Sequence, residues 1–318
     1  MGRRRPRALA AAFALLGIAA AQAADTPLRA QRWLAPRADV VRALTTAPPE
    51  CLSPAPDPET RLAVEIGRAA FRTPTVLGGQ AARAGVACET CHRSGRDNRD
   101  FQFPGVSGAP GTADVTSSLF SSHRGDGIDD PVPIPDLSGP RANLKVAPAG
   151  LSPFIHGLIT EEFDGPEPPA AVLAGLVAYV GALSPSACPR ALADPVAVKG
   201  LMSDARRAIA AAQALAARGD RPAAVVMVAA ARARLFLIDE RYAALPGSRR
   251  ALRAADARLA ALAQALREGR PEAGADLARW SADSVKLEAA LTRREGRSLF
   301  DPNHLAAAVG RRLPREPS

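Results

Sequence analysis

Two cysteines and a histidine form the motif Cys88-Glu89-Thr90-Cys91-His92. The thiols and the imidazole at this spacing can attach a prosthetic group and ligate its metal. Two thiols one helical turn apart can reach the two vinyl groups of a haem, and the histidine that follows can present its imidazole to the iron. This Cys-x-x-Cys-His pattern is typical of c-type haem attachment. It predicts one covalent haem c, with Cys88 and Cys91 as the thioether residues and His92 as the proximal iron ligand.

The same two cysteines have competing interpretations as a thioredoxin-like redox pair or as half of a zinc site. A redox pair belongs in a βαβ context, and a zinc site needs a second pair of ligands. The sequence around Cys88 predicts neither of these. Haem attachment is therefore the favoured interpretation.

The other two cysteines, Cys51 and Cys188, flank this motif at a distance. In an oxidising compartment two leftover cysteines are most simply explained by a disulfide bond. Two buried thiols are the alternative that the sequence leaves open. The favoured prediction is a Cys51–Cys188 disulfide that brackets the haem-attachment region.

The second axial ligand of the iron would decide the function. The chain has three methionines, and none lies in the haem-attachment region. His123 is the first candidate and His156 the second, whereas His304 is expected at the surface; each could instead be an ordinary polar residue. Ligation by two histidines suits low-potential electron transfer, and an open site would admit peroxide or a small gas.

Haem propionates would also need partners, and arginine binds carboxylates in a bidentate manner. The arginines close to the motif in sequence are equally well explained as surface residues. They are Arg93, Arg96, Arg99 and Arg124. No catalytic carboxylate is assigned.

The elements that must position these residues are mostly helical. Residues 61–71 have apolar side chains near helical spacing around Gly67, and residues 169–183 predict a second helix with one apolar face. Residues 101–153 between them are rich in proline and glycine, so little regular structure is expected there. A loop this long in a compact domain suggests that it wraps a ligand.

This order of helix, haem turn, loop and helix resembles the c-type cytochrome fold, in which the first and last helices cross at a small residue against an aromatic one. Gly67 and Tyr179 are the candidates for that crossing. The stretch Ile66-Gly67-Arg68-Ala69-Ala70-Phe71-Arg72-Thr73-Pro74 resembles the Leu-Gly-x-x-Leu-Phe-x-x-Pro stretch of the bacterial di-haem cytochrome c peroxidase family, in its N-terminal haem domain. The resemblance covers about residues 58–185. Because this chain has one haem motif, the resemblance implies a monohaem cytochrome and excludes a self-contained di-haem peroxidase.

The C-terminal part of the chain is rich in alanine, arginine and leucine. Leu252, Ala255, Leu259, Leu262 and Leu266 recur at spacings of three and four, and turn signals near 218–220, 246–247 and 269–271 separate about four helices. This pattern predicts an antiparallel helical bundle. The bundle is the basic part of the chain and could dock an acidic redox partner or a membrane surface.

The N-terminus predicts export. A basic start, an apolar stretch from Ala8 to Ala21 and the small-residue site Ala21-Gln22-Ala23 are typical of a cleaved signal peptide. A membrane anchor is the alternative, but the apolar stretch is shorter than a spanning helix needs. The expected location is the periplasm, where nucleic acid is a poor partner, and no later segment is expected to span a membrane.

Composition sets the fold class. The chain has 318 residues, of which 47% are hydrophobic and 23% charged, so it is neither wholly disordered nor a polytopic membrane protein. Aromatic residues make up only 4%, which disfavours an all-β fold. We expect a mainly α protein, a cytochrome c-like domain with long irregular loops followed by the bundle. The expected segments are a signal peptide at 1–23, a lead-in segment at 24–57, the haem domain at 58–188, a linker at 189–196, the bundle at 197–308 and a tail at 309–318.

The favoured function is one-electron transfer by an exported monohaem cytochrome that meets a redox partner protein. One alternative is a peroxidase-like or gas-sensing haem protein with an open sixth site. The other is a cytochrome subunit of a larger redox complex, in which the bundle is the assembly surface. An apolar stripe left uncovered on the bundle would favour the subunit.

Overall fold

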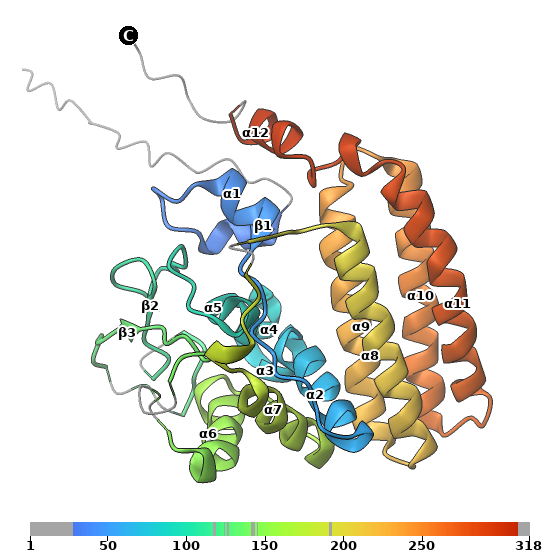
Figure 1. The fold of residues 1–318 in the computed structure, drawn as a ribbon, viewed down its shortest axis with the longest axis horizontal. Coiled ribbons are helices and arrows are strands. Elements are labelled where there is room, and N and C mark those ends of the chain that lie inside the picture. The colour runs from blue at the N-terminus through green and yellow to red at the C-terminus, as the bar shows by residue number, and fades with distance from the viewer. Residues whose placement is uncertain are drawn as a thin grey trace, which may run out of the picture.

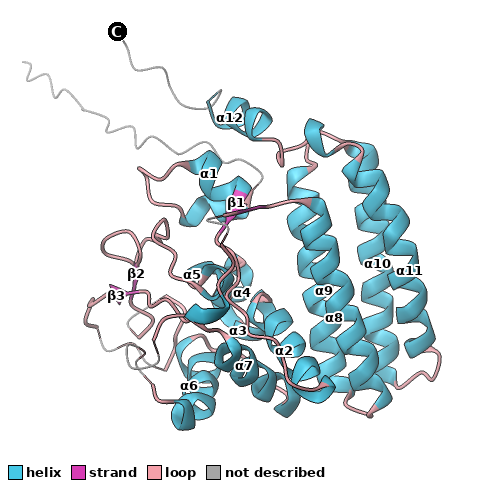
Figure 2. Cartoon of the chain, in the orientation of Figure 1, coloured by secondary structure: helices cyan, strands magenta, loops and turns pink. Residues whose placement is uncertain are grey.

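The computed structural model describes residues 28–310, apart from 117–118, 124, 126, 141–143, 145 and 191–192. The predicted signal peptide at 1–23 and most of the predicted tail at 309–318 lie outside the described residues. The chain is mainly helical, with 62% helix and 4% strand, which confirms the predicted α class. Figure 2 shows how few strands interrupt the helices and loops.

Two helices of the region 58–188 pack face to face. Helix α2 (Pro58–Phe71) begins with Pro58 in its first turn after the cap residue Asp57, whose side chain accepts a hydrogen bond from the Thr60 backbone. Helix α7 (Ala170–Ala182) crosses α2 at Gly67 and Gly175. The two predicted helices therefore form, with bounds close to those expected.

The crossing depends on the absence of side chains. A Cβ added at Gly67 would lie 1.8 Å from the carbonyl oxygen of Gly175. One turn further along α7, Tyr179 is fully buried, and its ring centroid lies 5.1 Å from that of Phe71. The sequence predicted Gly67 and Tyr179 for this crossing, and the structure adds Gly175 as the direct neighbour of Gly67.

The chain between α2 and α7 forms short elements joined by loops, in keeping with the prolines and glycines there. The haem motif forms the one-turn helix α5 (Cys88–Cys91). The other elements are α3 (Pro74–Leu77), α4 (Gly79–Ala84), η2 (Arg93–Gly95), β2 (Thr112–Ala113), β3 (Val132–Pro133), η4 (Pro148–Gly150), α6 (Leu151–Gly157) and η5 (Leu158–Glu162), of which η5 is π-helical. Strands β2 and β3 pair antiparallel, with Thr112 opposite Pro133.

The lead-in segment is folded onto the rest of the molecule. It contains η1 (Arg29–Trp33), α1 (Val40–Thr45) and β1 (Thr46–Ala47). Strand β1 pairs antiparallel with β4 (Asp194–Pro195), which lies in the predicted linker. The linker therefore fastens the lead-in segment to the start of the bundle.

The bundle consists of α8 (Val198–Ala217), α9 (Arg221–Arg241), α10 (Pro246–Glu268) and α11 (Ala273–Thr292). Gly219 and Gly269, both with positive φ, occupy two of the predicted breaks. Figure 1 shows α8 and α9 on the side that faces α2, with α10 and α11 beyond them. Two short helices, η6 (Pro185–Ala187) and η7 (Glu295–Arg297), precede and follow the bundle.

A last helix that the sequence did not predict, α12 (Pro302–Gly310), covers the lead-in segment. Its Leu305 is completely buried against Leu28 and Leu44. The predicted bundle segment at 197–308 therefore ends in a helix that packs away from the bundle core.

One hydrophobic core runs through both regions. Buried side chains of α2 and α7 form a single continuous cluster with those of α8 and α9, many of which are alanines. Met202 and Met227 are completely buried in this cluster. Among the described residues, no helix is both long enough and apolar enough to cross a membrane. The bundle is thus joined to the region 58–188 by shared packing and not by the linker alone.

The helix crossing can be tested by Gly67→Ala. The added methyl group would overlap the Gly175 carbonyl, so the free energy of unfolding should fall by about 1–3 kcal/mol or more. Gly181→Ala in α7 is the matched control, because nothing lies within 4 Å of its added Cβ, and it should leave stability unchanged or raise it by up to about 1 kcal/mol. Urea unfolding of both variants measures this. Equal effects of the two substitutions would contradict the crossing.

The structure contains the predicted disulfide between Cys51 and Cys188, which are 137 residues apart. Closing a loop of this length lowers the entropy of the unfolded chain and so stabilises the fold by about 4–5 kcal/mol at most. A reductant should therefore lower the urea midpoint of the native chain and leave that of the double variant Cys51→Ala/Cys188→Ala unchanged. A midpoint of the native chain that does not respond to reductant would contradict a stabilising bond.

Candidate functional site

Helix α5 presents the two cysteines of the haem motif from its first and last residues. Neither cysteine is in a disulfide, and both side chains pack partly buried against the hydrophobic core. The Ala87 backbone N–H donates to Thr90 Oγ1 at 3.0 Å, which fixes the start of the turn. Enclosure by the surrounding protein raises the pKa of Cys88 and of Cys91 to about 12, so both thiols are neutral.

His92 is held by a backbone carbonyl. Its Nδ1 lies 3.1 Å from the carbonyl oxygen of Pro135. Because a carbonyl oxygen can only accept, Nδ1 carries the hydrogen and Nε2 keeps its lone pair. Burial lowers the pKa of His92 to about 4, so the imidazole is neutral at physiological pH. The ring of Phe71 lies 6.4 Å from the imidazole, centroid to centroid.

The loop that carries the Pro135 carbonyl is fastened to the residues after His92. Arg96 Nε donates to Asp136 at 2.6 Å, and the Leu137 backbone N–H donates to the Gly95 carbonyl at 3.1 Å. Gly95 has a φ of +74° and packs so closely on Leu183 that an added Cβ would lie 2.5 Å from that side chain. The position of His92 therefore depends on the proline-rich loop and on the end of α7.

The structure places the candidate second ligands in hydrogen bonds with carboxylates. His123 Nδ1 lies 3.0 Å from Asp164, with 63% of the histidine side chain exposed. His156 Nε2 lies 2.8 Å from Glu167. His304 is exposed, as predicted, and its Nδ1 lies 3.3 Å from Asp301. In the described part of the chain, no hydrogen bond or ring contact links His123 or His156 to His92, so the ligand assignment stays a prediction.

The described arginines near the motif mostly have partners within the chain. Arg93 donates to the Thr46 carbonyl, and Arg96 is paired with Asp136. Arg99 is highly exposed and pairs with Asp97. Arg124 lies outside the described residues. Arg96 and Arg99 therefore have ion-pair partners within the chain, whereas the described contact of Arg93 is with a backbone carbonyl.

A buried ion cluster, which sequence reasoning missed, lies behind the haem motif. At its centre is Arg72, whose exposed fraction is 6%. Its guanidinium contacts Glu50 at 2.9 Å, Asp204 of α8 at 2.8 Å and Glu89 of the haem motif at 3.1 Å. The Tyr179 hydroxyl donates to Glu50 at 2.7 Å. One side chain thus joins the lead-in segment, the bundle and the haem motif.

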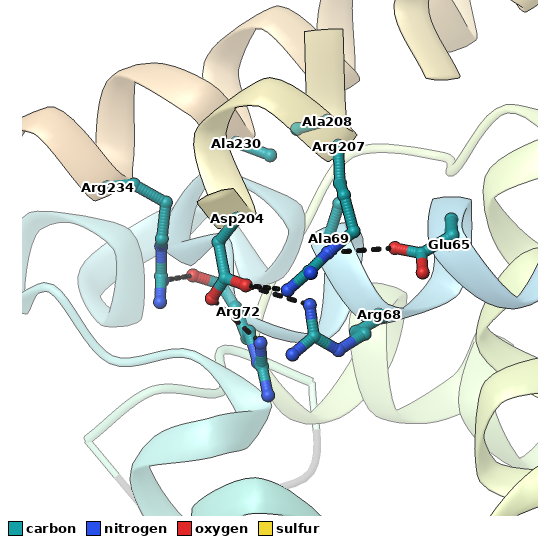
Figure 3. A pocket seen from close by; sticks show the side chains of 9 residues that line it. All are labelled: Glu65, Arg68, Ala69, Arg72, Asp204, Arg207, Ala208, Ala230 and Arg234. Carbon is teal, nitrogen blue, oxygen red and sulfur yellow. Dashed lines mark hydrogen bonds and ion pairs between the residues drawn. The ribbon is translucent and has the colours of Figure 1, made fainter. Parts of the chain in front are cut away.

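Two further arginines complete the ion cluster. Arg68 contacts Glu50 at 2.7 Å and Asp204 at 2.8 Å. Arg234 of α9 contacts Glu89 at 3.3 Å and donates to the backbone carbonyl of Arg72. Figure 3 shows Asp204 between arginines of α2 and of the bundle. No sequence signal marked these residues, because their partners lie far away along the chain.

The charges of the ion cluster set the acidity of its carboxylates. Burial acts to raise the pKa of Asp204, but Arg72 and Arg68, with help from Arg234, outweigh burial and hold that pKa well below its usual range. The pKa of Glu50 is also lowered, because Arg72 and Arg68 again outweigh burial. Both carboxylates therefore favour the folded state while they are ionised.

Comparison with protein-family models, curated proteins and solved structures finds no match for this chain. Among the described residues, no cluster of three or more histidine, cysteine or acidic side chains could hold a metal ion. The candidate site therefore stands on the residues 88–92, on the loop that holds His92 and on the ion cluster behind them.

The ion cluster predicts a loss of stability in acid. A carboxylate with a lowered pKa stabilises the fold above its ordinary pKa, near 4, and this contribution is lost as the pH falls. Asp204→Asn should lower the free energy of unfolding by about 3–5 kcal/mol at pH 7. Between about pH 5 and pH 2, the stability of this variant should fall less than that of the native chain. Urea unfolding across this pH range measures both effects.

Asp283→Asn is the matched control, because Asp283 pairs with Arg258 at 2.9 Å on the exposed surface of the bundle. Its cost should stay within about 1 kcal/mol at pH 7. An Asp204→Asn variant that kept the stability and the acid response of the native chain would show that the ion cluster does not hold the fold together.

Proposed function

We propose that this protein is a monohaem c-type cytochrome that transfers single electrons. The observation that carries the proposal is the donor set of residues 88–92. Cys88 and Cys91 lie one helical turn apart outside any disulfide, and His92 has Nδ1 bonded to the Pro135 carbonyl, which leaves Nε2 able to ligate a metal. These residues fit a covalently attached haem.

In this proposal three residues of the chain hold the haem, namely Cys88, Cys91 and His92. Cys88 and Cys91 would hold the haem through two thioether bonds, each made by addition of the S–H group across a vinyl double bond. His92 is held in one tautomer and one orientation by Pro135. The bound haem supplies an iron that gains and loses one electron. The side chains of Cys88 and Cys91 pack partly buried against the hydrophobic core.

Export and partners follow from the same proposal. The Cys51–Cys188 disulfide suits an oxidising compartment, and the predicted signal peptide suits delivery to the periplasm. The basic bundle offers a surface for a redox partner protein of opposite charge. In the alternative role as a subunit of a larger redox complex, the same surface would serve assembly.

Attachment is tested by Cys88→Ala/Cys91→Ala in cells that attach haem to exported proteins. The double variant should lose all haem staining on a denaturing gel, because thioether bonds alone survive denaturation. Thr90→Ser, in the middle of the motif, keeps both thiols and a hydroxyl that can accept from Ala87, and it should stain like the native chain. A stained band from the double variant would refute covalent attachment at these residues.

The sixth ligand separates electron transfer from the second candidate function. Met202 and Met227 are buried in the bundle core, which favours histidine ligation or an open site. With His123 as ligand, carbon monoxide should leave the visible spectrum of the reduced protein unchanged, and His123→Ala should make the spectrum respond. His304→Ala is the control and should not respond. A native protein that binds carbon monoxide would favour the peroxidase-like or gas-sensing function.

A further inference from the structure

A large cavity lies on the side of the haem motif that faces the lead-in segment and the bundle. Its volume is about 790 Å³. The motif contributes Glu89 and Thr90 to its wall, whereas Cys88, Cys91 and His92 do not line it. Figure 1 shows the segments that surround it, namely the lead-in segment with α1 and β1, helix α5 and the ends of α8 and α9. The cavity is therefore separate from the face that would hold a haem.

Two arginines of this cavity have no carboxylate partner among the described residues. Arg241 of α9 is 9% exposed and donates to the carbonyls of Leu299 at 3.0 Å and Leu44 at 2.5 Å. Arg93 donates to the carbonyl of Thr46. The nearby acids are engaged elsewhere, with Glu240 paired to Arg29 at 2.7 Å. Acids nearby offset part of the two positive charges, but neither guanidinium makes a direct ion pair among the described residues, and a bound anion would supply one.

The charges around Arg241 are consistent with an anion bound in the cavity. Burial lowers the pKa of Arg241 to about 10, and the positive charge of Arg93 acts in the same direction, while Glu240 and Glu295 oppose it. The two cations are therefore close enough to repel each other across the cavity. Each guanidinium keeps further N–H groups beyond those bonded to carbonyls, and these can bind an oxyanion.

Part of the wall is apolar, and the rest carries charged side chains, among which are the acids Glu50, Glu89, Asp194, Asp204 and Glu240. Leucines and a tryptophan from the lead-in segment face a leucine of α9 and a valine next to β4; they are Leu28, Trp33, Leu34, Leu44, Leu237 and Val196. The volume lies in the range of pockets that bury small organic ligands. An inorganic ion alone would leave the apolar part of the wall without a partner, so a ligand with an apolar body fits the cavity better.

We infer that this cavity binds a small organic anion, an apolar molecule whose carboxylate or phosphate group lies between Arg93 and Arg241. The oxyanion would supply the negative charge that the two arginines lack, and the apolar body would contact the leucines and Trp33. Because Arg93 directly follows His92, a bound ligand would lie next to the residue that anchors the haem motif. The inference stands on the cavity and does not depend on haem attachment.

The test uses decanoate as the probe, below its aggregation concentration, with the exported, disulfide-linked chain. Isothermal titration should show decanoate binding, with decanol and inorganic phosphate each at least tenfold weaker. Decanol lacks the charge and phosphate lacks the apolar body. Absence of decanoate binding, or decanol or phosphate binding as tightly as decanoate, would overturn the inference without the use of any variant.

Substitutions then locate the site. Arg241→Met and Arg93→Met should each weaken decanoate binding at least tenfold, because each removes one of the two cations. Arg258→Met removes an exposed arginine of the bundle that pairs with Asp283, and it should leave the affinity unchanged. Equal affinity in all three variants would place the probe elsewhere and overturn the assignment.

Discussion

The rest of the structure depends on the ion pairs of one buried arginine. Arg72 follows α2 and contacts carboxylates from the lead-in segment, the haem motif and the first bundle helix. An unpaired buried charge is costly, and at Arg72 the three carboxylates offset that cost, which holds these three segments together at this point. The bundle is thereby fixed against the haem motif and is not a domain tethered by a linker.

Contacts on two sides hold the haem motif, residues 88–92, in place. On one side, Glu89 binds Arg72 and Arg234, which joins the motif to α9. On the other side, His92 binds the carbonyl of Pro135 in the proline-rich loop. As the proposed iron ligand, His92 would have to keep one orientation through changes of charge, and this two-sided support suits that proposal.

Much of the architecture could be predicted because local rules determine it. The glycine and proline breaks of the bundle and the helices on either side of the loop follow from spacing and residue type. The disulfide was predicted because Cys51 and Cys188 are the two cysteines left outside the motif. The contacts that hold the haem motif and the bundle in place could not be predicted. The Pro135 carbonyl is a backbone group that no residue type marks, and Arg68 meets Asp204 across 136 residues of chain. Helix α12 was missed because its packing on the lead-in segment depends on tertiary contacts.

The most direct test of the central claim is the intact mass of the denatured native protein after export from cells that attach haem. Denaturation releases any haem that is not covalently bound. Because addition of a thiol to a vinyl group loses no atoms, a covalent cytochrome should have the mass of the exported chain plus one whole haem. The mass of the chain alone would contradict the proposed cytochrome.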